Sequence, residues 1–198
     1  MKPAFLVFGT ALAMVLSAGQ AVADPIGPDC GSCYGNIYTL TYDPIGTDIY
    51  RITLEIDTSG FVAIGSPEWL QAVSIKVAAN DADYVSVASV AQPEDWMGSL
   101  SLSAGFLTDT SLSANQFEVP DGTLAWTWDI GVAPGRLLAD PEEASVKAAF
   151  FRVGPSGRLE QRFTSERISL QTQVPEPASI VLVSTGLVGL RALKRRRR

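Results

Sequence analysis

Apolar and polar residues alternate along much of the chain, and the pattern is clearest at residues 50–57. Successive side chains of an extended strand point to opposite faces, so the four apolar residues of this segment share one face and the polar residues share the other. A shift of one residue would bury the polar set, so the register is well determined. The segment predicts a strand whose buried face consists of Tyr50, Ile52, Leu54 and Ile56.

The same period of two recurs elsewhere and predicts eight or nine strands in all. Turn-forming residues separate them at 43–46, 58–60, 80–81, 120–122, 133–135 and 154–157. Residues 66–68 allow one helical turn, but no long amphipathic helix is visible, so we expect an all-β fold: an antiparallel β-sandwich, jelly-roll or immunoglobulin-like. The further alternating positions are Tyr38, Leu40 and Tyr42; Val73, Ile75 and Val77; Val85 and Val87; Leu100 and Leu102; Leu124, Trp126, Trp128 and Ile130; Val146, Ala148 and Phe150; and Ile168 and Leu170.

Residues 1–23 have the features of a cleavable secretory signal peptide. Lys2 is followed by an apolar run at residues 4–16, and Ala21 and Ala23 place small residues at positions −3 and −1 of a cut after Ala23. An uncleaved anchor helix is the alternative, although the Ala-x-Ala site favours cleavage. Cleavage implies export into an oxidising compartment.

The other end, residues 174–198, combines three elements. Pro175, Glu176 and Pro177 hold the chain extended and accessible to a protease or transpeptidase. Residues 178–190 are apolar but reach only about 20 Å as a helix, against a hydrocarbon core of about 30 Å, so they span a membrane only if a flanking arginine bends toward the interface. The basic cluster that follows should remain cytoplasmic, with the acidic body outside.

This order of a Pro-Glu-Pro element, a short transmembrane helix and an Arg-rich tail resembles the PEP-CTERM sorting signal of exported bacterial proteins that an exosortase handles. The resemblance implies an inner-membrane intermediate, processing near the Pro-Glu-Pro element, and display on the cell surface or in the extracellular matrix of a Gram-negative type of bacterium that makes an exopolysaccharide. The implied partners are signal peptidase, exosortase, the membrane and exopolysaccharide. Many unrelated ectodomains carry this tag, so it indicates a destination and not an activity. An ordinary tail anchor is the alternative.

The segment between the two signals, residues 24–173, has the size of one domain. It holds 8 basic against 20 acidic residues, a formal charge of −12 within a chain whose total is −6. Such an acidic body would repel a phosphate backbone, so we expect no nucleic-acid binding. The chain has no histidine, which removes the commonest metal ligand and catalytic base.

Cys30 and Cys33 are the two cysteines of the chain, in the motif Cys-Gly-Ser-Cys. A Cys-x-x-Cys pair can exchange disulfides, but such pairs are usually activated at a helix N-terminus, and here strand-like sequence follows. In an exported protein the simplest state is a small structural disulfide between the two. Redox activity and unpaired or intermolecular thiols are the alternatives. Residues 30–42 also resemble the start of uncharacterised ectodomains with the same tag, which implies no known activity.

Four tryptophans are candidates for ligand contact, because aromatic faces stack on sugar rings. Trp126 and Trp128 share one strand face with leucine and isoleucine, which indicates core packing, and a ligand platform is the alternative. Trp69 and Trp96 follow Pro-Glu sequences near turns, so we expect them to be the more exposed pair and the better candidates for carbohydrate contact. The alternative is that they close the open ends of the sandwich, as loop tryptophans also do.

A weak calcium candidate lies at residues 80–83, Asn-Asp-Ala-Asp, where Asp81 and Asp83 supply carboxylates in a turn. The segment lacks the glycine and the distant glutamate of a helix-loop-helix calcium loop, and a solvated turn is the simpler interpretation.

Catalytic signatures are absent from the sequence: there is no nucleophile elbow, Walker loop or dinucleotide-binding glycine pattern. Adjacent acids at 94–95 and 142–143 could serve a glycosidase only if the fold brought them together. We therefore expect a non-enzymatic protein without a cofactor, associated with the cell surface or matrix. A carbohydrate-binding module that uses Trp69, Trp96 and a calcium loop is the alternative, and a carboxylate hydrolase is the third.

Overall fold

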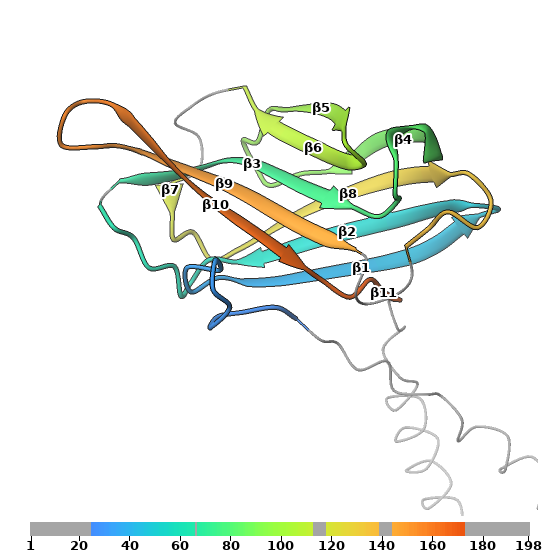
Figure 1. Ribbon diagram of the computed structural model, residues 1–198, viewed down its shortest axis with the longest axis horizontal. Coiled ribbons are helices and arrows are strands. Elements are labelled where there is room, and N and C mark those ends of the chain that lie inside the picture. Colours follow the sequence, from blue (N-terminus) through green and yellow to red (C-terminus); the bar gives the residue numbers. More distant parts are fainter. Residues whose placement is uncertain (1–24, 66, 113–117, 139–143, 173–198) are drawn as a thin grey trace, which may run out of the picture. The chain divides into compact units, whose positions relative to one another are not determined.

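The chain is an all-β antiparallel sandwich in the computed structural model, which describes residues 25–65, 67–112, 118–138 and 144–172 (Figure 1). Residues 23–173 form one compact unit. A five-stranded sheet, sheet A, has the order β11 (Gln171–Thr172), β1 (Ile37–Gly46), β2 (Ile49–Asp57), β8 (Thr123–Val132) and β4 (Tyr84–Ala91). A second sheet, sheet B, has the order β10 (Leu159–Arg167), β9 (Ser145–Val153), β3 (Glu68–Lys76), β6 (Phe106–Ser111) and β5 (Gly98–Ser103), and β7 (Glu118–Val119) also pairs with β3.

The centre of sheet A consists of β2 and β8, the two segments with the clearest alternation. Their antiparallel register places Leu54 opposite Trp126 and Ile52 opposite Trp128, and all four side chains are fully buried. The predicted core role of the two tryptophans is therefore confirmed. Arg51 and Asp129 pair on the outer face of the same strands, with Arg51 Nε 2.8 Å from Asp129 Oδ1.

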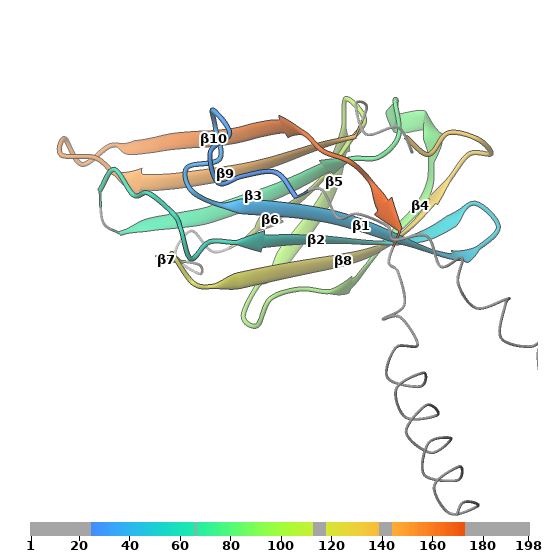
Figure 2. The same ribbon diagram turned by 90° about the horizontal axis from the view of Figure 1, so that it is seen from below.

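Sheet B covers this layer with its own apolar face, so that the core lies between the two sheets (Figure 2). The inward side chains alternate with outward ones along β3, β6 and β9, as period two requires. They include Val73 and Ile75 of β3, Leu107 of β6, and Val146, Ala148 and Phe150 of β9, each at most 1% exposed.

Several predicted boundaries were wrong. β1 continues through residues 43–46, with an irregular register between Pro44 and Gly46, and the turn comes at Thr47 and Asp48. Ile168 and Leu170 are buried but lie outside any strand, between the end of β10 and β11. β10 itself was missed because its sequence is rich in charged and polar residues, as is usual for a strand at a sheet edge.

Helix in the described residues is limited to the 3-10 turn η1 (Asp81–Asp83). Residue 68 opens β3, so the expected helical turn does not include it. None of the helical structure described has the length and apolar character needed to cross a membrane. The predicted signal peptide with Ala21 and Ala23, the Pro-Glu-Pro element and the C-terminal transmembrane helix lie outside the described residues.

Candidate functional site

Trp69 lies on the outer face of sheet B and is half-buried. Its ring stacks on Phe151 of the neighbouring strand β9, with centroids 5.3 Å apart and planes at 28°. The register continues this row across four strands, from Glu118 in β7 through Trp69 and Phe151 to Gln161 in β10. The structure therefore places one of the two predicted carbohydrate contacts within an ordered aromatic row.

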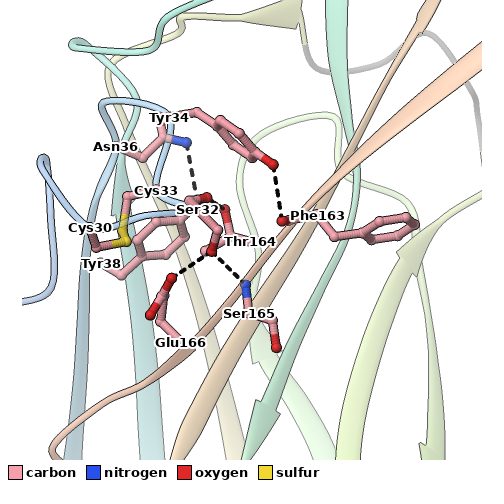
Figure 3. The surroundings of a disulfide bond; sticks show 10 residues. All are labelled: Cys30, Ser32, Cys33, Tyr34, Asn36, Tyr38, Phe163, Thr164, Ser165 and Glu166. Carbon is pink, nitrogen blue, oxygen red and sulfur yellow. Dashed lines mark hydrogen bonds between the residues drawn. A yellow bond between two sulfur atoms is a disulfide. The ribbon is translucent and has the colours of Figure 1, made fainter.

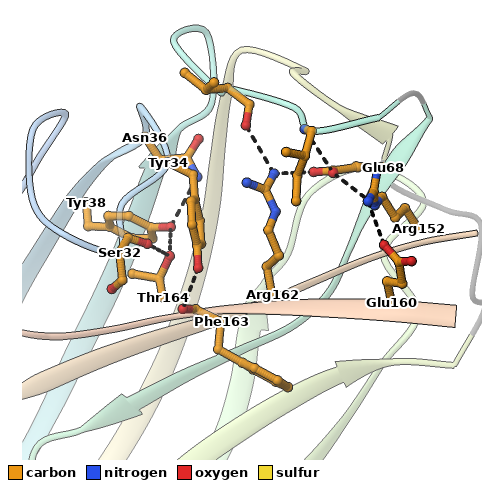
Figure 4. Close-up of polar contacts among 12 residues, drawn as sticks. Ser32, Tyr34, Asn36, Tyr38, Glu68, Arg152, Glu160, Arg162, Phe163 and Thr164 are labelled. Carbon is orange, nitrogen blue, oxygen red and sulfur yellow. Dashed lines mark hydrogen bonds and ion pairs between the residues drawn. The ribbon is translucent and has the colours of Figure 1, made fainter. Parts of the chain in front are cut away.

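Polar and apolar groups extend this outer surface, which we call the aromatic face and define by Trp69, Gln71, Phe151, Gln161 and Phe163. The amide of Gln161 donates to Gln71 Oε1 at 3.2 Å, beside the stacked rings. The Phe163 ring is 55% exposed and lies on the opposite side of β10 from Arg162 (Figure 4). Flat aromatic and amide groups of this kind suit the faces and hydroxyls of a sugar.

The expectation that Trp96 is exposed was wrong. Its side chain is 5% exposed and packs edge-on against Trp126, with ring centroids 5.1 Å apart. The connection between β4 and β5 folds it into the core because the indole N–H finds a buried acceptor, Asp109 Oδ1, at 3.0 Å. A glycan at the surface cannot reach Trp96, so of the two predicted carbohydrate contacts Trp69 remains the candidate.

Asp109 is the centre of a buried polar cluster that the sequence analysis missed. Its carboxylate, on the inner face of β6, is fully buried and accepts from Gln92 Nε2 at 2.8 Å, Trp96 Nε1 at 3.0 Å and Trp128 Nε1 at 3.4 Å. A Cβ at Gly98 would collide with this carboxylate. The only available signal was an acid at an inward position of the Phe106–Ser111 alternation, and its partners come from distant segments. The cluster joins the two sheets and is closed to substrates.

The two predicted calcium ligands point to protein donors. Asp81 accepts from the backbone N–H groups of Ala104 and Gly105 at 3.2 and 2.5 Å. Asp83 accepts from the backbone N–H of Asn80 at 3.1 Å and lies 3.6 Å from Arg136 Nε. Within the described ranges no group of three or more acidic, cysteine or histidine side chains could hold a metal. Calcium binding by Asp81 and Asp83 stays a prediction, and the geometry gives these carboxylates a structural use.

Cys30 and Cys33 are joined by a disulfide, with Cα atoms 5.2 Å apart (Figure 3). The turn that they close, residues 30–33, is here called the disulfide turn, and it contacts β10 of the other sheet. The Ser32 hydroxyl donates to Glu166 Oε1 at 2.6 Å and accepts from the backbone N–H of Ser165 at 3.1 Å. Thr164 Oγ1 donates to the Ser32 carbonyl at 2.8 Å.

A buried polar chain continues from the disulfide turn into the core. Tyr38 of β1 shares a hydrogen bond of 2.9 Å with Thr164 Oγ1 and accepts from Asn36 Nδ2 at 3.2 Å. Burial raises the pKa of the Tyr38 phenol, although these hydrogen bonds oppose the shift. The side of the sandwich between β1 and β10 is thus closed by directed polar contacts.

An ion cluster, defined by Glu68, Arg152, Glu160 and Arg162, lies at one end of the inner face of sheet B (Figure 4). Glu68 is 2% exposed and pairs with Arg162, which also donates to the Val62 carbonyl at 3.1 Å. Arg152 Nη2 lies 2.6 Å from Glu160 Oε2. The Arg162 guanidinium also lies 4.3 Å from the centre of the Tyr34 ring. Two arginines against two glutamates leave the cluster neutral, as a structural ion network requires.

The paired acids proposed for a hydrolase are not assembled in the described chain. Glu94 and Asp95 are neighbours in an exposed loop between β4 and β5. Glu142 and Glu143 lie outside the described residues.

Several solved structures are similar to this chain, all at low identity. An uncharacterised protein from Nocardia farcinica with an immunoglobulin-like fold is 14% identical with a TM-score of 0.34, over 66% of this chain and 97% of its own. A cohesin module from a Clostridium perfringens family 33 glycoside hydrolase is 9% identical with a TM-score of 0.34, over 70% and 96%. An exo-β-N-acetylglucosaminidase of family GH20 from Vibrio harveyi is 14% identical with a TM-score of 0.38, over 72% of this chain but only 19% of that enzyme.

Sequence comparison is informative at the C-terminal end. No curated protein matches the chain. Residues 173–198 match the family described as the PEP-CTERM protein-sorting motif, which contains the Pro-Glu-Pro element, the apolar stretch and the basic tail. The chain therefore carries a PEP-CTERM sorting signal, which implies an exported protein that passes through a membrane-anchored intermediate and is processed by an exosortase.

Proposed function

We propose that this protein is a non-enzymatic component of the cell surface or extracellular matrix, delivered there by an exosortase and associated with exopolysaccharide. The observation that carries the proposal is the sorting motif at residues 173–198. The acidic sandwich would be the delivered part, and the cytoplasmic Arg-rich tail would be left behind on cleavage.

The chemistry of the sandwich supports a binding or structural role over catalysis. Asp109 and Glu68, the two fully buried acids described above, are each occupied by several protein donors or cations. Neither carboxylate is free to act as an acid, base or nucleophile, because catalysis needs a group within reach of substrate.

The test is cell fractionation of the full chain in its own host. A Glu176→Ala variant should accumulate uncleaved in the inner membrane, whereas Glu118→Ala, a matched change at an exposed acid of β7, should be sorted as the natural chain is. A natural chain found full-length in the cytosol alone would defeat the proposal.

Carbohydrate binding by the aromatic face is a second candidate, favoured by the half-exposed Trp69 stacked on Phe151. Retention of the exported protein on the host polysaccharide and on a glycan array should fall at least tenfold in Trp69→Ala. Leu112→Ala, which removes an equally apolar side chain that is 71% exposed elsewhere, should retain binding. Addition of a chelator tests the calcium prediction for Asp81 and Asp83, and retention on no sugar would remove this candidate. Release of sugar from the polysaccharide would instead favour the hydrolase.

A further inference from the structure

Four strands end the two sheets, and three of them are protected. In sheet A the short β11 pairs with one side of β1, while β4 at the opposite edge has register shifts at Val85 and Val90. In sheet B the edge strand β10 carries four charged residues, and its backbone N–H at Ser165 donates to Ser32 of the disulfide turn. Charges, bulges and covering segments are the usual means by which proteins prevent an edge strand from pairing with another chain.

The fourth edge, β5, has none of these protections among the residues that the structure describes. Its six residues, Gly-Ser-Leu-Ser-Leu-Ser, pair with β6 without any irregularity and contain neither charge nor proline. Asp109 is the sole charged residue of the whole hairpin 98–111, and its side chain is buried. A regular, neutral edge in a body of formal charge −12 is an unusual surface for an isolated domain.

A groove lies beside this edge, between β5 and β4, and its lining is part apolar and part polar. Its volume is about 370 Å³, and its walls come from β4, from β5 and from Leu107 of β6. Val85 and Leu102 in these walls are 72% and 40% exposed, while Tyr84 is almost buried and donates its hydroxyl to the Gly105 carbonyl at 2.7 Å. Residues 77–83 and 92–97, which connect β4 to the other sheet, cross at the two ends of this side, and the groove lies between them.

The free backbone groups of β5 follow from its hairpin. Ala104 and Gly105 form a two-residue turn with φ of 54° and 78°, and Ser103 pairs with Phe106 beside it. In such a hairpin the backbone groups of every second residue, counted from Ser103, face the partner strand, so those of Leu100 and Leu102 face the open edge.

We propose that β5 pairs antiparallel with β5 of a second copy of this chain. A two-fold axis at Ser101 would set Ser101 opposite its own copy and Leu100 opposite Leu102 of the second copy. This register brings together the free backbone groups of both strands. It also keeps leucine opposite leucine on the groove side and serine opposite serine on the outer side, because opposite residues of an antiparallel pair share one face. Sheet B then continues through both molecules, and the leucines of the second strand cover the groove.

The sequence and charge of β5 favour a second copy over other occupants. The strand is self-complementary, as an isologous two-fold interface requires. Two acidic bodies repel each other, and the neutral hairpin is a place where they can approach without charge repulsion. The groove is lined mainly by valine and leucine, with two serines, one almost buried tyrosine and no charged residue, whereas a sugar requires exposed aromatic faces and many hydrogen-bonding groups.

The experiment uses the full chain, exported in its host, with Ser101→Cys. Opposite residues that do not exchange backbone bonds have Cα atoms about 4.5 Å apart, within the range that a disulfide bridges. The natural cysteines are bonded to each other, so the new thiol has no partner within its own chain. We expect most of the exported protein to migrate as a dimer on a non-reducing gel and as a monomer after reduction. Ser156→Cys, an exposed serine in the β9–β10 turn, is the matched control and should remain monomeric.

The register has its own test. Ser99 lies opposite Ser103 of the second copy, so neither Ser99→Cys nor Ser103→Cys should cross-link alone, whereas co-expression of the two should give a dimer. A monomeric Ser101→Cys chain, or a Ser101→Cys adduct with a different protein, would overturn the proposal. Because the readout is a site-specific bond between copies, it is independent of where the exosortase delivers the protein.

Discussion

The two sides of this sandwich differ in how the edges of the two sheets are joined. On the side of β1 and β10, the disulfide turn spans from one sheet to the other, and Ser32, Tyr38 and Thr164 form a continuous set of hydrogen bonds between them. On the side of β4 and β5, residues 77–83 and 92–97 cross between the sheets at the two ends, and a groove is left between the strand edges. We call the first the closed side and the second the open side.

The difference shows which surface is available to a partner. Hydrogen bonds from Tyr34 and Ser32 on the closed side occupy the Phe163 carbonyl and the Ser165 N–H of β10, which another strand would need. The open side leaves the edge backbone groups of β5 facing the solvent and exposes Val85 and Leu102, and burial of these apolar side chains by a partner would be favourable. The last described strand, β11, lies at the closed edge of sheet A.

The largest expected effect comes from breaking the ion cluster that joins β3 to β10. Glu68→Ala leaves two arginines without their buried partner and should lower the free energy of unfolding by about 3–5 kcal/mol. The measurement is urea unfolding of the exported protein. Glu118→Ala removes an exposed glutamate from the adjacent strand β7 and should cost less than about 0.5 kcal/mol. Equal losses in the two variants would show that the cluster does not stabilise this side.

Removal of the disulfide tests the closed side directly. Cys30→Ser with Cys33→Ser frees a loop of four residues, for which chain entropy predicts a loss of about 2 kcal/mol. Ser32 still holds the turn to β10 in this variant, so the loss of order should be local. The first backbone segment to be cut by a protease should therefore be residues 25–36. Limited proteolysis with mass spectrometry identifies the first cleavage site. First cleavage within β4 or β5 would contradict the assignment of the disulfide turn as the segment that holds β10 to the other sheet.

Substitution of Tyr38 should change the free energy of unfolding by less, and the change should depend on pH. Tyr38→Phe removes one hydroxyl with two partners and should cost about 1 kcal/mol at neutral pH.

Burial raises the pKa of Tyr38, so its neutral form is favoured in the folded state. Its contribution is fully present below the ordinary tyrosine pKa of about 10 and is lost as pH rises through the folded value. Tyr38→Phe should therefore lose less stability than the natural chain above that pH. Tyr84, whose pKa burial also raises, serves as the comparison on the open side. The same alkaline loss in Tyr38→Phe and the natural chain would count against this role.

The smallest effect is expected at the open side. Val85→Ser changes a side chain that is 72% exposed, so the stability of the monomer should change by less than about 0.5 kcal/mol. Urea unfolding at low protein concentration measures this. A loss above about 1.5 kcal/mol would mean that the groove is already covered within one chain, and the contrast between the two sides would fail.

The local sequence pattern predicted the burial of some side chains near the candidate site and failed to predict that of others. Trp126 and Trp128 could be assigned to the core because each lies between apolar residues at a spacing of two. Trp96 has no such neighbours, and its burial depends on Asp109, which follows it by 13 residues in another strand. Glu68 and Arg162 are 94 residues apart, and neither position differs in sequence from an ordinary surface charge. Polar residues of this kind could not be placed because their partners are distant in sequence.

The sequence by itself determined the export route and the fold class. The sorting signal is a continuous segment that a single stretch of sequence specifies, and strands reveal themselves through a period of two that only local backbone geometry imposes. Tertiary structure decided which edges of the two sheets are covered. The disulfide turn reaches β10 across more than 130 residues of sequence, and β5 is left as an edge only because of where every other strand pairs. Edges are a property of the order of strands in a sheet, and that order follows from long-range packing rather than from any one segment.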